Sequence, residues 1–334
     1  MAELRFGSTD AAPESRAQEA LVREGMRALM LSGSVFLRAH MSAPWSYESP
    51  NAEQMGALLA AKGERIIVFH VITEGRCRIE LSDGRVGADF EAGDIAILPF
   101  CDQHRMGDSS VEHATPFHEV LPDLLGTPVV RFGGGGTAVS MLCGYLRCDD
   151  MPLNPVLASL PPLIRVSTAG GPLGRWIEAS IQYALHTLSR QGIDDPLLQR
   201  LPELLFIECL CNFAAKRTAS NDRGWLAGLS DPVVGRALGC MHREPEHPWT
   251  LKELARRAAS SRSVLDARFR ELLGRAPMSY LTAYRLQLAS RRLRTTQDTM
   301  AEVANAVGYA SEAAFSRAFK RHVGKSPSEW RSAG

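Results

Sequence analysis

The spacing of hydrophobic positions changes along this chain of 334 residues. From about residue 64 to 150, short apolar runs alternate with turns that contain Gly and Asp, as in RIIVFHVI-TEG and CRIELS-DGRVG. Repeated short strands of this kind are typical of a β-sandwich or barrel. Over residues 172–219 the period becomes helical, with apolar residues recurring every three or four positions. The pattern therefore predicts an α+β, multidomain chain.

Two further elements precede the β-rich region, a helix over residues 14–31 and a strand over residues 34–45. Later in the chain, the segment 197–215 is apolar over more than one helical stripe, which predicts that it buries a second face. That face could pack against a second copy of the chain or against its own β-domain. The expected domains are residues 1–160, a helical linker or dimerisation segment over 161–228, and an all-α domain over 229–334.

The last hundred residues contain an internal repeat, with one copy over residues 250–280 and the other over 299–330. Four positions of the first copy recur 50 residues later, so that Leu265, Phe269, Gly274 and Pro277 correspond to Phe315, Phe319, Gly324 and Pro327. Each copy has the pattern of two helices joined by a short turn. Between them, residues 279–296 predict one long helix, able to hold two recognition helices about 34 Å apart, one turn of DNA.

Charge divides the chain in the same place. The net charge is only +1, but residues 231–334 carry 18 Lys and Arg against 10 Asp and Glu. Residues 1–230 carry 20 against 27. This asymmetry favours a basic module that faces nucleic acid, attached to an acidic sensor or catalytic part. A basic face that is merely solvated would give the same charge balance.

The segment GYASEAAFSRAFKRHVGKSPSEWR, residues 308–331, resembles the C-terminal signature of the AraC family of bacterial transcription regulators. The resemblance implies a tandem helix-turn-helix domain that binds double-stranded promoter DNA and acts with RNA polymerase. It assigns base-reading roles to five positions: Ser263, Asp266, Ala267, Ala313 and Arg317. Helical spacing places four more residues on the same outward faces: Arg262, Arg270, Ser316 and Lys320. Arg291, Arg292 and Arg321 also suit phosphate contact.

These candidate positions differ in what they could recognise. Arg317 suits a bidentate contact to guanine. Ala267 can contact only a thymine methyl group, and Asp266 could accept a hydrogen bond from the amino group of cytosine while repelling phosphate. The second unit therefore has the stronger predicted base contact.

Upstream, the segments IIVFHVITEGRCRIEL (66–81) and FEAGDIAILPFCDQHRMGD (90–108) resemble the cupin-type sensor domain of a subset of that family. The resemblance implies a small cupin-like β-barrel. Residues 99–104 fit the second cupin metal motif, ending in His104, with Cys101 in place of the usual Gly. The Glu position of the first motif falls on Val68, and the paired histidines that should precede it are absent.

Alternation along the strand adds a second histidine to this pocket. Val68 and His70 share one face, so His70 points inward if Val68 does. Together with His104 and Cys143 it could bind zinc or another divalent metal, or form a thiol pocket with Cys101 that responds to oxidants. Hydrogen-bonded histidines and buried thiols without any such role are the alternative.

The sequence thus predicts a DNA-binding regulator whose barrel senses a small molecule, metal or oxidant. The alternative is a metal-dependent cupin enzyme, a dioxygenase or isomerase, but only one motif ligand is retained. His113 and His118 fall in a predicted loop and are reserve candidates. Seven cysteines without framework spacing, and no apolar run of about 20 residues, indicate a cytoplasmic chain without a membrane partner, and we expect a homodimer.

Overall fold

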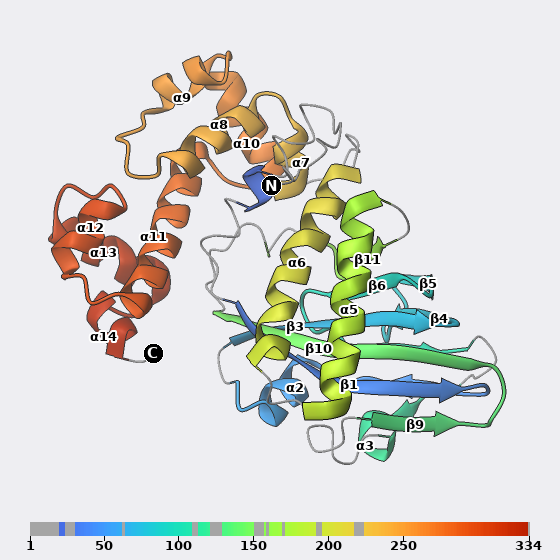
Figure 1. Cartoon of the computed structure of the whole chain (residues 1–334). Coiled ribbons are helices and arrows are strands. Elements are labelled where there is room, and N and C mark those ends of the chain that lie inside the picture. The colour runs from blue at the N-terminus through green and yellow to red at the C-terminus, as the bar shows by residue number, and fades with distance from the viewer. Residues whose placement is uncertain are drawn as a thin grey trace, which may run out of the picture.

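The computed structural model shows a β-rich part, two long helices and a helical C-terminal part (Figure 1). It describes residues 20–23, 31–61, 64–108, 113–120, 129–149, 157, 160–168, 171–191, 196–216 and 224–332. The helix expected over 14–31 lies mostly outside these residues, although the described residues 20–23 are helical.

Two sheets form the β-rich part. The larger has the strand order β11-β6-β3-β10-β1-β9. Its strands are β1 (Leu31–Ser42), β3 (Glu64–Glu74), β6 (Asp94–Leu98), β9 (Val129–Gly133), β10 (Ala138–Asp149) and β11 (Ile164–Ser167). The smaller sheet, in the order β5-β4-β7-β2-β8, contains β2 (Ser46–Glu48), β4 (Arg76–Leu81), β5 (Gly87–Glu91), β7 (His104–Gly107) and β8 (Thr115–Pro116). Of two short helices, α2 (Ala52–Leu58) lies beside β3 and α3 (Phe117–Val120) lies beside β2 and β8.

The chain passes from one sheet to the other at Gly75. This residue has φ of +74°, and a Cβ atom there would lie 2.4 Å from the backbone oxygen of Ala138. Only glycine fits such a corner. The strands confirm the predicted β-rich region, and β11 extends the larger sheet beyond the boundary expected at residue 160.

Both faces of the larger sheet are apolar, because each face packs into a different core. Alternate residues of β1, such as Leu37 and Met41, point into the core between the two sheets. On the opposite face, Phe69 and Val71 of β3 belong to a second core with Ile97 of β6. Burial on both faces explains why these strands have nearly continuous apolar runs in the sequence.

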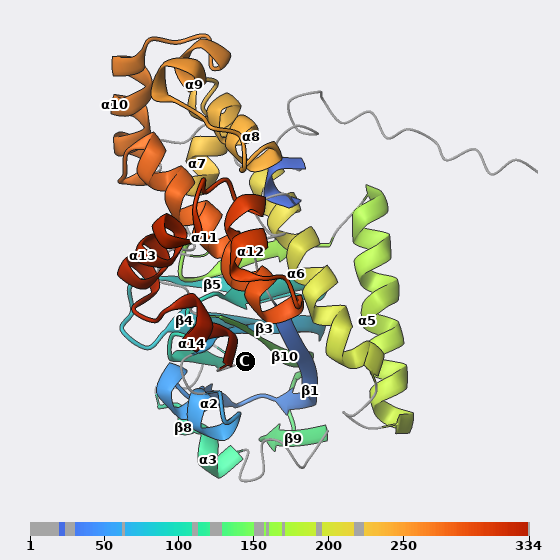
Figure 2. The ribbon, with the colours of Figure 1, turned by 90° about the vertical axis from the view of Figure 1, so that its left-hand side faces the viewer.

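The outer face of the larger sheet is covered by α6 (Pro196–Lys216), with α5 (Gly171–Gln191) beside it (Figures 1 and 2). Leu205, Phe206 and Cys209 of α6 lie against β3 and β6. Of the two partners expected for this apolar helix, the structure therefore shows its own sheet. The larger exposed aromatic residues are on α5, where Trp176 is 39% and Tyr183 is 47% exposed.

The C-terminal part consists of eight helices in the described chain. They are α7 (Trp225–Ser230), α8 (Val234–Arg243), α9 (Leu251–Arg257), α10 (Arg262–Leu273), α11 (Pro277–Thr295), α12 (Met300–Ala306), α13 (Glu312–Val323) and α14 (Pro327–Ser332). The predicted anchor residues Leu265, Phe269, Phe315 and Phe319 are all completely buried. Both helix-turn-helix units and the long helix between them are confirmed. No described helix has the length and hydropathy needed to cross a membrane.

The N-terminal and C-terminal parts share one apolar core. It includes residues of β3 and α6 together with Trp225, Phe269 and Tyr280 of the first helix-turn-helix unit. The described residues 20–23 also join the two parts, because Val22 is fully buried in this core and Arg23 forms an ion pair with Glu208 of α6 at 2.6 Å. The β-rich part and the first C-terminal helices are therefore packed together.

A buried polar group stabilises the core of the first unit. The hydroxyl of Tyr280 accepts a hydrogen bond from Trp225 Nε1 at 2.8 Å and lies 2.8 Å from His242 Nε2. The His242 ring stacks on Tyr284 with centroids 4.1 Å apart. Burial lowers the pKa of His242 to about 3, so the ring is neutral and its Nε2 accepts the hydroxyl proton of Tyr280.

The buried ring of His242 should make stability depend on pH. Unfolding lets it bind a proton below its ordinary pKa of 6.5, whereas the folded state takes up that proton only near pH 3. The free energy of unfolding therefore falls as the pH drops through this window, by about 1.4 kcal/mol per pH unit. His242→Phe is expected to reduce this slope between pH 6.5 and about 5, measured by chemical denaturation. An unchanged slope would contradict a neutral buried His242.

Candidate DNA-binding surface and barrel pocket

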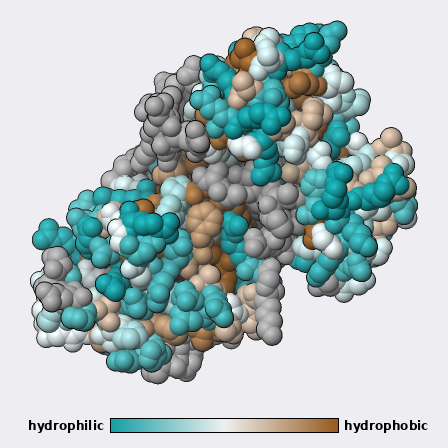
Figure 3. Space-filling model, turned by 180° about the vertical axis from the view of Figure 1, so that it is seen from behind, coloured by the Kyte–Doolittle hydropathy of each residue, from teal (hydrophilic) through white to brown (hydrophobic). Residues whose placement is uncertain are grey.

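The two recognition helices are built in the same way. Ser261 caps α10 by accepting a hydrogen bond from the amide of Val264, and Ser311 caps α13 by accepting one from Ala314, both at 3.2 Å. Both helices end at a glycine in the left-handed conformation. The two helices lie on the same side of α11 in the view of Figure 2, and hydrophilic residues cover most of the C-terminal helices in Figure 3.

The outward face of α10 presents the predicted residues, but they are not all free. Arg262, Ser263 and Ala267 are exposed. Asp266 forms an ion pair with Arg270 at 2.8 Å, so a contact from Asp266 to cytosine would have to break it. This pairing could not be read from the sequence, because the helical spacing allows but does not require it.

Two further residues of α10, Val264 and Arg268, were not among the predicted contacts. Val264 is 45% exposed beside the predicted base-reading positions. Its apolar type gave no signal, since such a residue in a helix is usually buried. Arg268 instead faces α7, where it pairs with Asp231. It is therefore a structural arginine.

On α13, Ala313, Arg317 and Lys320 are exposed, and Ser316 is half-buried. Within the described part of the chain, Arg317 makes no hydrogen bond or ion pair, which leaves its guanidinium available for DNA. Among the predicted phosphate contacts, Arg291 and Arg321 are exposed. Arg292 is also solvent-accessible but bonds to Asp298 at 2.6 Å.

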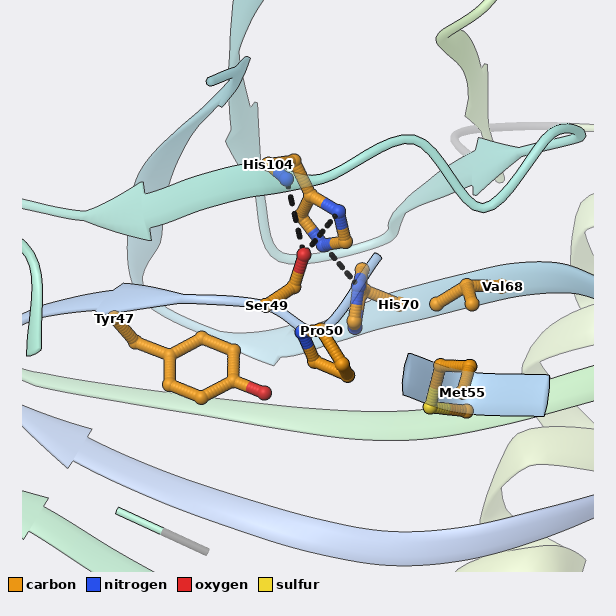
Figure 4. Close-up of a pocket in the computed structure, with 7 residues that line it drawn as sticks. All are labelled: Tyr47, Ser49, Pro50, Met55, Val68, His70 and His104. Carbon is orange, nitrogen blue, oxygen red and sulfur yellow. Dashed lines mark hydrogen bonds between the residues drawn. The ribbon is translucent and has the colours of Figure 1, made fainter. Parts of the chain in front are cut away.

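Between the two sheets, three of the four predicted pocket residues meet. Cys143 lies opposite His70 in the pairing of β10 with β3, and its Sγ is 3.1 Å from His70 Nδ1. On the other side of the ring, His70 Nε2 lies 2.9 Å from His104 Nε2. His104 Nδ1 in turn lies 2.9 Å from the backbone oxygen of Asp102 and 2.8 Å from Ser49 Oγ (Figure 4).

Only one arrangement of protons satisfies these contacts with neutral rings. The carbonyl of Asp102 can only accept, so His104 Nδ1 donates and its Nε2 must accept. His70 Nε2 therefore donates, His70 Nδ1 accepts, and the Cys143 thiol donates to it. The four groups form a directed hydrogen-bonded chain from Cys143 to Asp102, which we call the Cys143–His70–His104 chain.

Burial keeps this chain uncharged. It lowers the pKa of His104 to about 4, and together with the neighbouring His104 ring it lowers the pKa of His70 well below its ordinary value. Burial also raises the pKa of the Cys143 thiol. The resting thiol is therefore protonated, which makes it a weak nucleophile.

A small cavity adjoins the two histidines. Its lining includes Tyr47, Ser49, Pro50, Met55, Val68, His70 and His104 (Figure 4). The cavity volume of about 20 Å³ is close to the space that one water molecule needs. Ser49 and Met55, which the sequence reasoning missed, come from a segment with no motif to mark them.

The other candidates lie apart from this cavity. Cys101 is buried on the turn before β7 with φ of +52°, and burial together with Asp102 raises its pKa to about 12. His113 and His118 are exposed. Neither of these two histidines lines the cavity.

Comparison with known proteins identifies the family. A family model described as cupin matches residues 21–214, and a helix-turn-helix domain model matches residues 254–333. An AraC-like transcription regulator of Streptomyces lividans is 31% identical over 272 residues, which cover 80% of this chain and 87% of that protein. The chain belongs to the AraC-like family of transcription regulators. It is a DNA-binding regulator with a cupin domain.

A second relative agrees with this assignment, and one solved structure is also similar in sequence. The transcriptional regulator AlkR of Acinetobacter baylyi is 30% identical over 270 residues, 79% of this chain and 87% of that protein. A crystal structure of the DNA-binding domain of AdpA in complex with a target DNA has 35% sequence identity. It covers 31% of this chain and 93% of that domain, with a TM-score of 0.30. The relatives are regulators, so the alternative of a cupin enzyme is wrong.

The metal site of a cupin domain does not fit the residues of this AraC-like protein. Among the described residues no group of three or more His, Cys, Asp or Glu could hold a metal ion. The predicted zinc set of His70, His104 and Cys143 fails because His70 uses opposite sides of its ring toward the other two. In addition, apolar Val68 lines the cavity at the usual Glu position, so no carboxylate offsets a cation there.

Arg317→Ala is expected to weaken binding to a duplex selected by the wild-type protein from a random library. The loss should be about 1–3 kcal/mol, with relaxed preference at one base pair, because a bidentate guanine contact disappears. Binding is measured by fluorescence anisotropy on the duplex and its single-base variants.

Arg268→Ala is the matched control, since Arg268 pairs with Asp231 on the neighbouring α7. It should leave the base preference unchanged. Equal affinity of the Arg317 variant and the wild type for every duplex would contradict the role assigned to Arg317.

Proposed function

We propose that this AraC-like regulator reads promoter DNA with α10 and α13, and that a chemical change at the Cys143–His70–His104 chain alters its affinity. The observation that carries the proposal is the buried chain of donors and acceptors, which ties β10, β3 and β7 together through a single bond between His70 and His104. Any molecule that enters between these rings must break that bond. The strands would then shift against α6, which shares a core with the first helix-turn-helix unit.

The size and chemistry of the cavity favour an oxidant as the effector. About 20 Å³ accommodates a molecule of a few atoms but not a sugar. Met55 lines the cavity, and Cys143 lies on the other side of the His70 ring, 3.1 Å from its Nδ1. Both sulfur types accept an oxygen atom from peroxides. At Cys143 the thiol and ROOH would give a sulfenic acid and ROH, with the O–O bond broken and sulfur oxidised.

The hydrogen-bonded chain would assist this step by handling the thiol proton. As the sulfur attacks the peroxide, the S–H proton is accepted at His70 Nδ1, which already lies 3.1 Å from the sulfur. It is then returned to the oxygen that leaves as ROH. Because Cys143 is buried, the response would require an oxidant that passes from the cavity beside the His70 ring to reach the sulfur.

We also propose that two copies of the chain pair through α5. Trp176 and Tyr183 are separated by seven positions, so they lie on one face of that helix. Both are more than a third exposed, although large aromatic residues are usually covered. A homodimer would place two readers on one promoter, in the cytoplasm where RNA polymerase is its second partner.

Cys143→Ser is expected to abolish the effect of hydrogen peroxide on affinity for the selected duplex, because the hydroxyl cannot form a sulfenic acid. Cys148→Ser is the matched control, since Cys148 is buried on the same strand but belongs to the core on the opposite face. Affinity is measured before and after peroxide treatment, and mass spectrometry identifies the oxidised residue. The same peroxide response in wild type and Cys143→Ser would exclude the site.

Replacing Trp176 by Glu is expected to shift the protein from dimer to monomer, because a charge would have to be buried between two copies. Sedimentation velocity on the full chain measures the change. Gln182→Glu, on an exposed position of the same helix, serves as the control for added charge. A wild-type protein that sediments as a monomer would contradict the dimer.

A further inference from the structure

The two helix-turn-helix units meet at one point of the long helix α11. Tyr284 of this helix belongs to the core shared with the first unit, whereas Leu286 belongs to the separate core of the second unit. Arg285 lies between them in the sequence. The contacts of Arg285 therefore act at the junction between the two units.

Arg285 bonds to the loop that leads into the first unit. Its Nε donates to the backbone oxygen of Pro245 at 2.6 Å, and its Nη2 donates to that of His247 at 2.7 Å. A guanidinium with two donors in a fixed plane restrains both the position and the direction of the loop. The ammonium of a lysine would not reproduce this pair of contacts.

The loop between α8 and α9 is itself held firmly. Trp249 Nε1 donates to the backbone oxygen of Glu244 at 2.8 Å, and the Trp249 amide donates to that of His247 at 2.7 Å. Thr250 follows at once as the N-cap of α9. Whatever holds this loop therefore also holds the first helix of the first unit.

The second unit approaches the same point from the other side. Gly308, in the turn between α12 and α13, has φ of +82°. A Cβ atom at this position would lie 2.7 Å from the backbone oxygen of Glu246 and 2.8 Å from Arg285 Nη2. The turn of the second unit therefore rests against both the loop of the first unit and the arginine that holds it.

We propose that Arg285 is a positioning residue that fixes the spacing of α10 and α13, and thereby makes the protein select one distance between the two DNA segments that it reads. Both helices can enter the major groove of one duplex only if their separation matches about one helical turn. A rigid junction makes the second contact effectively intramolecular at that spacing and excludes it at others. The proposal depends on DNA binding by both units, and on no property of the barrel.

A merely structural role for Arg285 would lower stability and affinity at every operator spacing alike. A positioning role predicts a change in the preference among spacings. The decisive quantity is therefore the ratio of affinities for two duplexes that differ only in the distance between the two recognised segments.

The test uses the full chain and a library of random duplexes. Wild type, Arg285→Met and Arg285→Lys are each used to select bound duplexes, and the distance between the two enriched segments is read by sequencing. Gly308→Ala adds a Cβ atom that crowds the same junction from the side of the second unit. Arg331→Met is the control, because Arg331 also donates to two backbone oxygens, those of Leu293 and Asp298, but both lie inside the second unit. Thermal unfolding is recorded for each variant.

The wild type and Arg331→Met should enrich one spacing, and inserting one base pair into the selected duplex should weaken their binding about tenfold or more. Arg285→Met and Gly308→Ala should enrich several spacings or a single segment, with a loss of about threefold or less on insertion. Arg285→Lys should resemble Arg285→Met. The proposal is overturned if the folded variants retain the wild-type spacing and the same loss on insertion. If the wild type selected only one segment, the proposal that both units bind DNA would itself be overturned.

Discussion

The packing of α6 on the outer face of the six-stranded sheet is the contact on which the rest of the molecule depends. Without it, β3 and β6 would expose Phe69, Val71 and Ile97 to water. With it, one apolar core contains residues of the sheet and α6 together with Val22 and with Trp225 and Tyr280 of the first helix-turn-helix unit. Close-packed protein interiors transmit small displacements instead of absorbing them. This continuity gives a barrel pocket a physical route to a DNA-binding surface.

Two hydrogen-bonded polar groups lie inside these cores. The Cys143–His70–His104 chain lies between the sheets, and the Trp225–Tyr280–His242 group lies inside the first unit. In both, burial keeps the imidazoles neutral. His70 and His104 each donate on one side and accept on the other, whereas His242 accepts at Nε2 and its buried Nδ1 has no hydrogen-bond partner among the described residues. Such networks specify one arrangement of the strands or helices that they join. They are also the places where a proton, an oxygen atom or a small ligand would have the largest effect.

The sequence predicted the repeated and periodic features well. The 50-residue repeat located both recognition helices, because anchors such as Leu265 and Phe319 must recur wherever the same packing recurs. Strand alternation brought His70 to the same interior as His104. It failed on the zinc set, since alternation gives the direction of a side chain but not the orientation of its ring. It also missed Ser49 and the pairing of Asp266 with Arg270, which depend on contacts that spacing does not determine.

The central claim is that the sheet and the first helix-turn-helix unit are coupled through α6. Hydrogen exchange followed by mass spectrometry on the full chain tests it directly, with Phe206→Ala used to loosen the contact of α6 with the sheet. The account predicts faster exchange in α6 and also in α10 and the first half of α11, with the second unit unchanged because it has its own core. Faster exchange in α6 alone, with α10 and α11 at wild-type rates, would contradict the coupling.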